Sequence, residues 1–255
     1  YLASIYLGKD QHGISFVDIS TGEFLVAEGG TAQVDKLLQS LQPKEILFSR
    51  TQQKDFVKRF GHKFYTYALD DWAYQYEFGR ETLLEHFQTQ SLKGYGIEEQ
   101  EMGIVAAGAA LHYLSETEHG NLKHINQIAR IPEDKYVWLD RFSIRNLELI
   151  FSPQEDATTL FDVLDHTLSP MGARMLKKWI VLPLKDIREI QERQQVVEHL
   201  IKQVDDRDLI KKQIKAIGDL ERLITKVPMA KIGPREVVQL KRSLEALKPI
   251  KEVLA

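Results

Sequence analysis

The chain has 255 residues, enough for one large domain or two ordinary domains, and it begins at Tyr1 without Met, which is typical of a fragment of a longer protein. It is 43% hydrophobic and 28% charged, the balance of a soluble globular protein, and its net charge of −3 lacks the basic excess usual in a compact DNA-binding domain. Without cysteine it holds neither disulfides nor thiolate metal sites, which suits a cytoplasmic protein; no signal peptide is visible, and no apolar run approaches the roughly 18 residues of a membrane span.

The first half of the chain mixes strand-like and helix-like patterns. Short apolar or alternating runs separated by turn residues predict three consecutive antiparallel strands over residues 2–7, 13–19 and 23–27. Amphipathic spacing then predicts a helix over 31–41, which Pro43 ends. The elements expected after it are a strand at 45–48, a helix at 51–60, a strand at 63–67 and helices at 70–88 and 102–117. This order, β-β-β-α-β-α-β-α, is that of an RNase H-like α/β fold, which we expect over residues 1–125.

The pattern changes near residue 120. Residues 121–134 form a polar connection with a short strand expected within 125–131, and from residue 135 onward nearly every segment has helical spacing. The helices are marked by three apolar stripes: Ile187, Ile190, Val197, Leu200, Ile201 and Val204; Leu220, Leu223, Ile224 and Val227; and Val237, Val238, Leu240, Leu244 and Leu247. The sequence therefore predicts a second, all-α domain over residues 126–255.

The clearest helix boundaries lie near the middle of this helical half. Ser169 can cap free backbone N–H groups and Pro170 fits the first helical position, so a helix is expected to begin there. It should stop before Pro183, because proline disfavours helical geometry in the residue ahead of it. A second helix is expected to open at Asp186, with Glu189 three residues on in capping-box spacing.

These boundaries lie within a run of residues that resembles the core domain of the MutS family, the bacterial DNA mismatch-recognition ATPases. The family pattern combines an Arg-Asn-Leu-Glu segment, a Pro-Met-Gly helix start and a Trp ahead of a Pro-Leu pair. The matching positions are Asp140, Arg145, Asn146, Leu147, Glu148, Leu164, Asp165, Thr167, Pro170, Met171, Gly172, Arg174, Leu176, Trp179, Pro183, Leu184, Asp186, Ile190, Arg193 and Val197. Residues 218–223 and 234–236 extend the resemblance, and residues 18–24 and 94–98 resemble the MutS connector domain, so it spans nearly the whole chain.

The resemblance implies a domain order and a role. Residues 1–125 would be the RNase H-like connector domain, domain II of MutS, and residues 126–255 the N-terminal part of the helical core or lever domain, domain III. Such a fragment would couple the DNA-binding and ATPase parts of a homodimer, offer a docking surface to the partner protein MutL and perform no catalysis of its own. The full-length protein would bind mismatched double-stranded DNA, a second MutS subunit, ATP and Mg²⁺, so neither a cofactor nor a membrane is expected to bind this chain.

Six residues of the helical half are candidates for interdomain or structural roles: Arg145, Glu148, Pro170, Gly172, Arg174 and Trp179. Arg145 and Glu148 can pair on one helix surface, either as a solvated ion pair or as the joint between domains that the family implies. Arg174 near a helix N-terminus could attract a phosphate, but the apolar residues around it favour a buried structural helix. Gly172 is expected to permit close backbone approach from a neighbouring element, and Trp179 to lie in the core with Met171, Met175 and Leu176.

Arg80 and Glu81 are candidates for docking the MutL partner. They lie in the polar helical region 70–90, where further charge comes from Asp71, Glu77, Glu85 and His86. The aromatic residues Trp72, Tyr74 and Tyr76 are either anchors of this surface or part of the domain's core.

Other chemistries have less support in the sequence. A metal-dependent nuclease needs converging carboxylates, one of them in the first strand, but residues 2–7 contain no acid and Asp18 lies beside a turn. His112, Glu116 and His119 share one helix face and could hold a metal, yet a polar solvated face has the same spacing. No glycine cluster has the spacing of a nucleotide-binding loop, and the basic pairs at 177–178 and 211–212 are typical of solvated faces. A MutS-like recombination paralogue is the alternative within the superfamily.

Overall fold

The computed structural model describes residues 1–117, 122–132, 135–137, 139, 141–152, 154 and 156–254. The chain divides into two compact units, unit 1 (residues 1–132) and unit 2 (residues 133–255). Unit 1 combines a mixed sheet with helices, whereas the regular elements described in unit 2 are helices. The chain is therefore an α/β unit followed by a helical one. The predicted domain limit at residue 125 stays a prediction, although Ile128 still packs in the core of unit 1.

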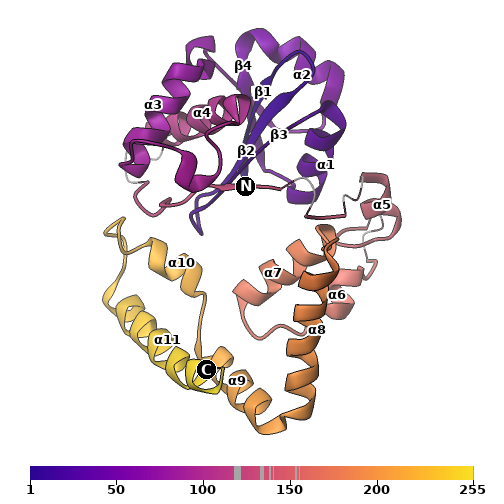
Figure 1. The fold of residues 1–255 in the computed structure, drawn as a ribbon, viewed down its shortest axis with the longest axis vertical. Helices are drawn as coiled ribbons and strands as arrows, with labels where there is room; N and C mark the ends of the chain where they lie inside the picture. Colours follow the sequence, from indigo (N-terminus) through magenta and orange to yellow (C-terminus); the bar gives the residue numbers. More distant parts are fainter. Residues whose placement is uncertain are drawn as a thin grey trace. The chain divides into compact units, whose positions relative to one another are not determined.

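Unit 1 is built on a six-stranded sheet in the order β5-β4-β1-β2-β3-β6; β1 to β4 are labelled in Figure 1. β1, β2 and β3 are antiparallel neighbours, as the short turns between them require. β4 and β5 run parallel to β1, and β6 runs parallel to β3. The strands are β1 Leu2–Leu7, β2 His12–Asp18, β3 Glu23–Gly29, β4 Glu45–Ser49, β5 Thr66–Leu69 and β6 Ala129–Arg130.

Helices cover both faces of this sheet: α3 and α4 lie on one side, and α1 and α2 on the other (Figure 1). The α-helices are α1 Thr31–Leu41, α2 Gln53–Phe60, α3 Tyr76–Phe87 and α4 Glu101–Thr117. Three short 3₁₀ helices join them: η1 Arg50–Gln52, η2 Asp71–Tyr74 and η3 Lys93–Tyr95. Most of α4 is apolar and buried, because it packs on the sheet and against α3 at once.

The contact between α3 and α4 is a backbone contact. A Cβ atom built on Gly108 of α4 would lie 2.2 Å from the Cα of Gly79 in α3. A Cβ on Gly79 would lie 3.0 Å from the carbonyl oxygen of Ile104. Two glycines are therefore what lets these helices touch at their main chains.

The predicted elements of unit 1 are confirmed, with two changes of type. The helices predicted at 51–60 and 70–88 each begin as a 3₁₀ helix, and Gln75, with φ −89° and ψ 141°, separates η2 from α3. The strand predicted at 63–67 lies slightly later, at β5, because its register is set by pairing with β4. Local pattern identified these elements, while tertiary pairing fixed their limits.

Unit 2 consists of seven described helices, α5 to α11. They are α5 Arg141–Asn146, α6 Leu160–Leu164, α7 Pro170–Val181, α8 Ile187–Lys202, α9 Val204–Ala216, α10 Leu220–Thr225 and α11 Pro234–Val253. Ser169 caps α7 as predicted, its Oγ accepting a hydrogen bond from the N–H of Gly172 at 3.1 Å. α7 ends at Val181, ahead of Pro183.

The capping box predicted at the start of α8 is wrong. Asp186 does cap the helix, because its Oδ1 accepts a hydrogen bond from the N–H of Arg188 at 2.7 Å. Glu189, however, binds Lys135 at 2.9 Å instead of returning to the cap. Because the Glu189 carboxylate pairs with Lys135, it does not accept the hydrogen bond from the backbone N–H of Asp186 that would complete a capping box.

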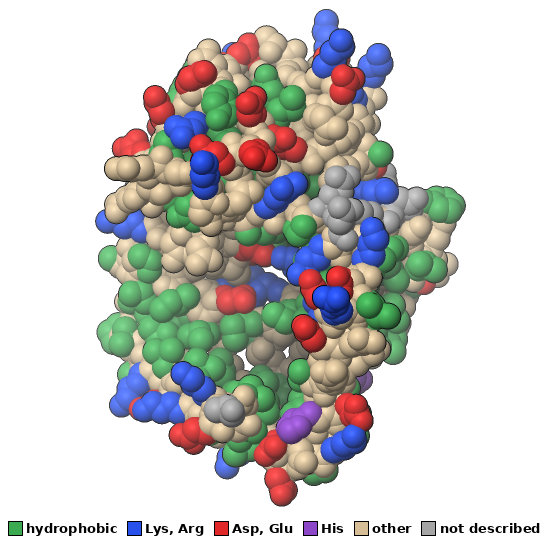
Figure 2. All heavy atoms as spheres, in the orientation of Figure 1, with side chains coloured by type: hydrophobic (Ala, Val, Ile, Leu, Met, Phe, Trp, Pro, Cys, Tyr) green, Lys and Arg blue, Asp and Glu red, His purple; other side chains and the backbone are tan. Residues whose placement is uncertain are grey.

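The apolar stripes predicted in unit 2 remain largely uncovered. The stripe predicted over residues 187–204 is also broken, since α8 ends at Lys202 and Val204 begins α9. Hydrophobic side chains gather on the surface over α10 and α11 (Figure 2). Among the described residues of unit 2, the buried hydrophobic ones are Ile144, Leu149, Val181, Leu182, Leu184, Ile217, Leu223 and Ala246.

Candidate functional site

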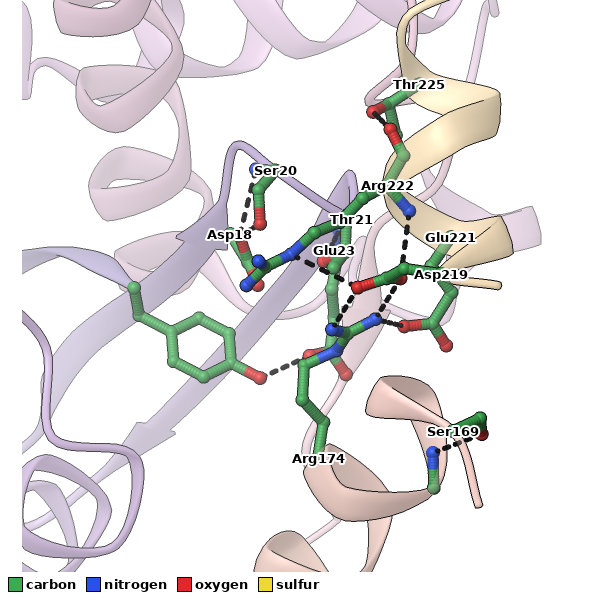
Figure 3. Close-up of polar contacts among 12 residues, drawn as sticks. Asp18, Ser20, Thr21, Glu23, Ser169, Arg174, Asp219, Glu221, Arg222 and Thr225 are labelled. Carbon is green, nitrogen blue, oxygen red and sulfur yellow. Dashed lines mark hydrogen bonds and ion pairs between the residues drawn. The ribbon is translucent and has the colours of Figure 1, made fainter. Parts of the chain in front are cut away.

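Among the described residues of unit 2, Arg174, Asp219, Glu221 and Arg222 form an ion-pair network, the Arg174 network (Figure 3). Arg174 donates from Nη1 and Nη2 to the two carboxylate oxygens of Asp219 at 2.8 and 2.7 Å. Nη2 also donates to Glu221 at 2.5 Å, and Arg222 approaches Asp219 at 3.6 Å. The planar guanidinium thus holds α7 and α10 in a defined orientation as well as at a defined distance.

Helix ends position the acidic side of this network. Asp219 is the N-cap of α10 and also accepts a hydrogen bond from the N–H of Arg222 at 3.3 Å. Glu221 lies in the first turn of the same helix, where a negative charge is favoured by the helix dipole. Arg174 lies in α7, whose start is fixed by Ser169 and Pro170. The sequence motif that starts α7 therefore also places the guanidinium.

The network shifts the proton affinity of its members. The hydrogen bonds from Arg174 hold the pKa of Asp219 below its usual value of 3.8, although burial opposes this. The same hydrogen bonds to Asp219, with those to Glu221, raise the pKa of Arg174. Arg174 is therefore a fixed cation compensated by two carboxylates. The phosphate-attracting role considered for it is disfavoured, because an incoming anion would have to displace both of them.

The network extends from α10 to α11. Lys226, the C-cap of α10, pairs with Glu236 in the first turn of α11. Glu236 also accepts a hydrogen bond from the N–H of Gly233 at 2.9 Å, so it caps α11 while holding the preceding helix. Charged contacts consequently link α7, α10 and α11 in series.

The expected pairing of Arg145 with Glu148 on one helix surface is wrong. α5 ends at Asn146, and Glu148 has a left-handed backbone with φ +46°, so the two residues share no helix face. The Glu148 carboxylate instead accepts a hydrogen bond from Ser152 at 2.7 Å. A three-residue spacing suits pairing on a helix, but α5 ends two residues before Glu148.

The remaining two candidates of α7 occupy places that differ from those expected. A Cβ on Gly172 would meet the Cβ of Thr167 at 3.2 Å, so the close approach comes from the preceding loop and not from another element. Trp179 is 42% exposed and not a core residue. Its ring lies against Arg193 of α8, whose Cζ is 3.6 Å from the ring centroid. The α8 residue that meets the ring is Arg193, so a cation–π contact replaces the core packing expected for Trp179.

The two docking candidates of unit 1, Arg80 and Glu81, differ in their contacts. Arg80 binds Glu98 at 3.2 Å, and Glu98 in turn accepts a hydrogen bond from the N–H of Leu92 at 2.7 Å. That backbone bond, followed by the one from Arg80, lowers the pKa of Glu98. Arg80 therefore supports the loop ahead of α4, whereas Glu81 is exposed on α3. Of the aromatic residues considered, Tyr74 is buried and Trp72 is 48% exposed.

The structure adds no support for metal or nuclease chemistry. Asp18 accepts hydrogen bonds at 2.9 and 2.7 Å from the backbone and hydroxyl of Ser20; burial alone would raise the pKa of Asp18, but these bonds outweigh it and lower the pKa. His112 packs its ring against Trp72, with centroids 4.8 Å apart. His119, like Asp140, lies outside the described residues. Within the described part of the chain, no three His, Asp or Glu side chains converge as a metal site, and no helix has the length and apolarity to cross a membrane.

Sequence reasoning missed the partners of Arg174. Asp219 and Glu221 were recognised only as part of a resembling segment, and their distance along the chain gave no sign of contact. One available signal was an acid ahead of a short apolar helix, which is the pattern of an N-cap. Such a pattern identifies the cap but not the arginine that binds it.

Two family models match the chain, MutS domain II over residues 1–126 and MutS domain III over residues 143–255. Curated proteins named DNA mismatch repair protein MutS are similar along its whole length. The protein of Cytophaga hutchinsonii is 54% identical over 254 residues, which is 100% of this chain and 30% of that protein. The proteins of Flavobacterium psychrophilum and Bacteroides thetaiotaomicron are 53% and 52% identical, each over 99% of this chain and 29% of their own length.

The chain thus spans about 30% of the length of the curated relatives it matches. The two matches follow the division seen in the structure, with the sheet-containing part as domain II and the helical part as domain III. The aligned region, about half of it identical, covers nearly every residue of the chain. By sequence and by domain order, the chain belongs to the MutS family.

Proposed function

We propose that this chain is the transmitting part of a DNA mismatch repair protein. In this proposal, the full-length homodimer binds mismatched double-stranded DNA and hydrolyses ATP with Mg²⁺ through parts outside the two matched domains. The 255 residues couple those parts mechanically and hold no cofactor or catalytic group. The names of the relatives and the two domain matches support the assignment to repair.

The observation that carries the coupling role is the Arg174 network. It joins two helices whose contacting residues are 45 positions apart, and the Lys226–Glu236 pair passes the connection on to α11. A bidentate fork resists both sliding and rotation, so a displacement of α7 is transferred to α10. Contiguous contacts between rigid elements, such as these, can carry coupling between distant sites.

For unit 1 we propose an RNase H-like fold without nuclease activity and a docking role toward MutL. The element order β-β-β-α-β-α-β-α supports the fold. Ser4 of β1 is hydrogen-bonded to Tyr74 at 3.0 Å within the core, a place that offers nothing to a metal ion. The exposed face of α3 around Glu81 is the proposed docking surface.

The coupling proposal is tested in a chimera. The matching segment of the Cytophaga hutchinsonii relative is replaced by this chain, and the chimera is expressed in a strain of that bacterium without its own MutS. We expect the chimera to lower the spontaneous mutation frequency, and Arg174→Gln to raise it again. The matched control is Arg222→Gln, since Arg222 contacts the same aspartate only at 3.6 Å.

Purified chimera separates coupling from folding. Arg174→Gln should leave mismatch binding and ATP hydrolysis near their parent levels while it reduces the release of mismatched DNA on addition of ATP. Equal ATP-induced release in the two proteins would refute the transmitting role. A chimera that does not lower mutation frequency, although soluble and abundant, would refute the assignment to repair.

The docking role is tested with the 255-residue chain. We expect weak association with the MutL protein of Cytophaga hutchinsonii in a titration, because one small polar patch buries little area. Glu81→Lys should abolish this association. Lys54→Glu on α2, on the other side of the sheet, is the control; Arg80 is unsuitable because its reversal would break the contact with Glu98. Equal binding by the Glu81 variant and the parent would move the site off α3.

A further inference from the structure

Three exposed aromatic side chains gather at one edge of unit 1. Tyr65 is 73% exposed, Tyr67 49% and Trp72 48%, and they are the large hydrophobic residues that the described part of unit 1 leaves open to solvent. All three lie within or beside β5, the strand at the end of the sheet. Exposed aromatic residues grouped in a domain that otherwise buries its apolar side chains indicate an interaction surface.

The backbone at this edge is available for pairing. Among the strands of the described residues β5 pairs with β4 alone, and the register sets Ile46 opposite Thr66 and Phe48 opposite Ala68. Ile46 donates to the carbonyl of Tyr65 at 2.9 Å, so the odd-numbered residues of β5 direct their backbone groups to β4. The N–H and C=O groups of Thr66 and Ala68 consequently point to the open side. An unpaired strand edge of this kind accepts a further strand.

A carboxylate lies among the tyrosines. Glu45 of β4 is next to Tyr65 in the ladder, and its two oxygens are each 3.3 Å from the hydroxyl of Tyr113, at the long end of hydrogen bonding. The rings of Tyr67 and Tyr113 are 5.4 Å apart. Burial raises the pKa of Tyr113 to about 12, with Glu45 and the neighbouring tyrosines adding to the effect. Tyrosine faces around one weakly engaged carboxylate form an environment that suits a cation.

From this arrangement we propose that β5 is a docking edge for an extended peptide segment that carries an arginine or lysine. The peptide backbone pairs with Thr66 and Ala68. Its basic side chain lies over Tyr65 and Tyr67 and binds the carboxylate of Glu45. Main-chain pairing supplies affinity, and the charged pocket selects the residue, as in other cases of strand addition.

The charges of the edge favour a peptide over a nucleic acid. Aromatic residues alone would also stack on bases, but Glu45 would repel a phosphodiester chain. A second copy of this chain paired through β5 would place two tyrosine clusters together, and the strand Thr66–Leu69 itself carries no basic residue to offer Glu45. The basic extended peptide is the occupant that satisfies both the backbone and the charge.

The test uses the 255-residue chain labelled with ¹⁵N and a short, blocked peptide of alternating threonine and valine with one central arginine. Titration should shift the amide signals of Thr66 and Ala68 first. Two control peptides are matched to it: one has glutamate in place of arginine, and one has N-methyl groups on the amides of one edge. We expect each control to bind about tenfold more weakly, the effect of losing one charged contact or the edge hydrogen bonds.

Variants of the protein test the same two elements. Thr66→Pro removes an outward N–H at an edge position where proline is tolerated, and it should weaken binding about tenfold. Thr66→Val keeps that N–H and should bind like the parent. Glu45→Gln should reduce the preference for the arginine peptide over the glutamate peptide to about twofold or less, because the charge is gone while the amide keeps the shape. If Thr66→Pro unfolds, the N-methylated peptide still tests backbone pairing.

Several outcomes would overturn the proposal. Absence of shifts at Thr66 and Ala68 at millimolar peptide would remove the docking edge. Equal binding of the arginine and glutamate peptides would remove the cation pocket. Stronger binding of oligothymidylate than of the peptide at the same signals would assign the surface to nucleic acid. Concentration-dependent dimerisation lost in Thr66→Pro would assign it to a second copy of the chain.

Discussion

The two units are stabilised by different kinds of contact. Unit 1 encloses its large apolar side chains on both faces of its sheet, and Phe16, Phe24, Phe48 and Phe56 are almost fully buried. In unit 2, neither α8 nor α9 has a buried residue, and Ile187, Ile201 and Leu254 are each more than 60% exposed. Helices of unit 2 are instead fixed at their ends by caps and ion pairs. Unit 1 is therefore expected to be held mainly by burial, and unit 2 mainly by polar contacts.

This difference affects how each unit responds to change. Burial is spread over many contacts, so a core tolerates small shifts poorly but does not depend on one group. A polar link depends on the charge state of a few atoms and weakens with salt and acid. Movement is easier where few apolar contacts resist it. A part that transmits displacement would benefit from the second arrangement.

The largest expected contrast is between two aromatic truncations. Phe48→Ala should cost about 3–5 kcal/mol, because a buried aromatic side chain and its packing are lost. Trp179→Ala should cost only about 1 kcal/mol, the scale of an exposed cation–π contact with some apolar area. The free energy of local unfolding is measured by native-state hydrogen exchange of the 255-residue chain, at β4 and at α7. Equal costs would mean that Trp179 is part of a core after all.

The next effect concerns the Arg174 network. Arg174→Gln should destabilise the contact between α7 and α10 by about 1–2 kcal/mol, after allowing for partial solvent exposure. The pKa of Asp219 is depressed, so its contribution is present above the ordinary value of 3.8 and is lost as pH falls below it. The difference between parent and variant in hydrogen exchange at α10 should therefore shrink below about pH 4. If this difference stayed constant down to pH 2, the contact between Arg174 and Asp219 would not depend on the charge of the aspartate.

A smaller effect is expected at the cap of α7. Ser169→Ala should raise the exchange rate of the first-turn amides and cost about 1 kcal/mol, since the N–H of Gly172 loses its acceptor. Ser169→Thr keeps a hydroxyl and is the matched control. Loss of the same size in both variants would indicate that packing of the side chain, and not its hydrogen bond, fixes the start of α7.

The smallest effect is a titration within unit 1. His12 is buried and donates to or accepts from Thr31 at 2.8 Å, and burial, aided by the charge of Arg59, lowers the pKa of His12 below 6.5. Its contribution to stability is therefore present above pH 6.5 and is lost as pH falls through the lowered value. NMR of the imidazole nitrogens should show His12 titrating below pH 6.5. Titration of His12 above pH 6.5 would contradict the burial of the ring.

Local sequence patterns were sufficient for most of unit 1. Alternation and turn residues predicted β1, β2 and β3, and the spacing of Val34, Leu37 and Leu41 predicted α1 with its observed limits. The docking candidate Glu81 was found on an exposed helix face as expected. These features depend on neighbours a few positions apart, which is what periodicity records.

The failures concern contacts that periodicity does not record. The spacing of Arg145 and Glu148 is correct for a helix, but it does not say that α5 ends at Asn146. Trp179 was expected in the core with Met171, Met175 and Leu176, but helical spacing gives no information on what faces its ring, and α8 presents Arg193. Likewise, nothing local to Arg174 indicates Asp219, which folding brings from 45 positions away.

Because α3 and α4 touch through two glycines, a substitution in the interior of unit 1 would change the position of α3 at its surface. Gly108 is buried beneath α3, and a single methyl group there would lie 2.2 Å from the Cα of Gly79, so the two helices would have to move apart. Glu81 would be carried with that helix, although its own surroundings would be unchanged. The docking surface proposed on α3 would therefore be altered by a substitution that its partner never contacts.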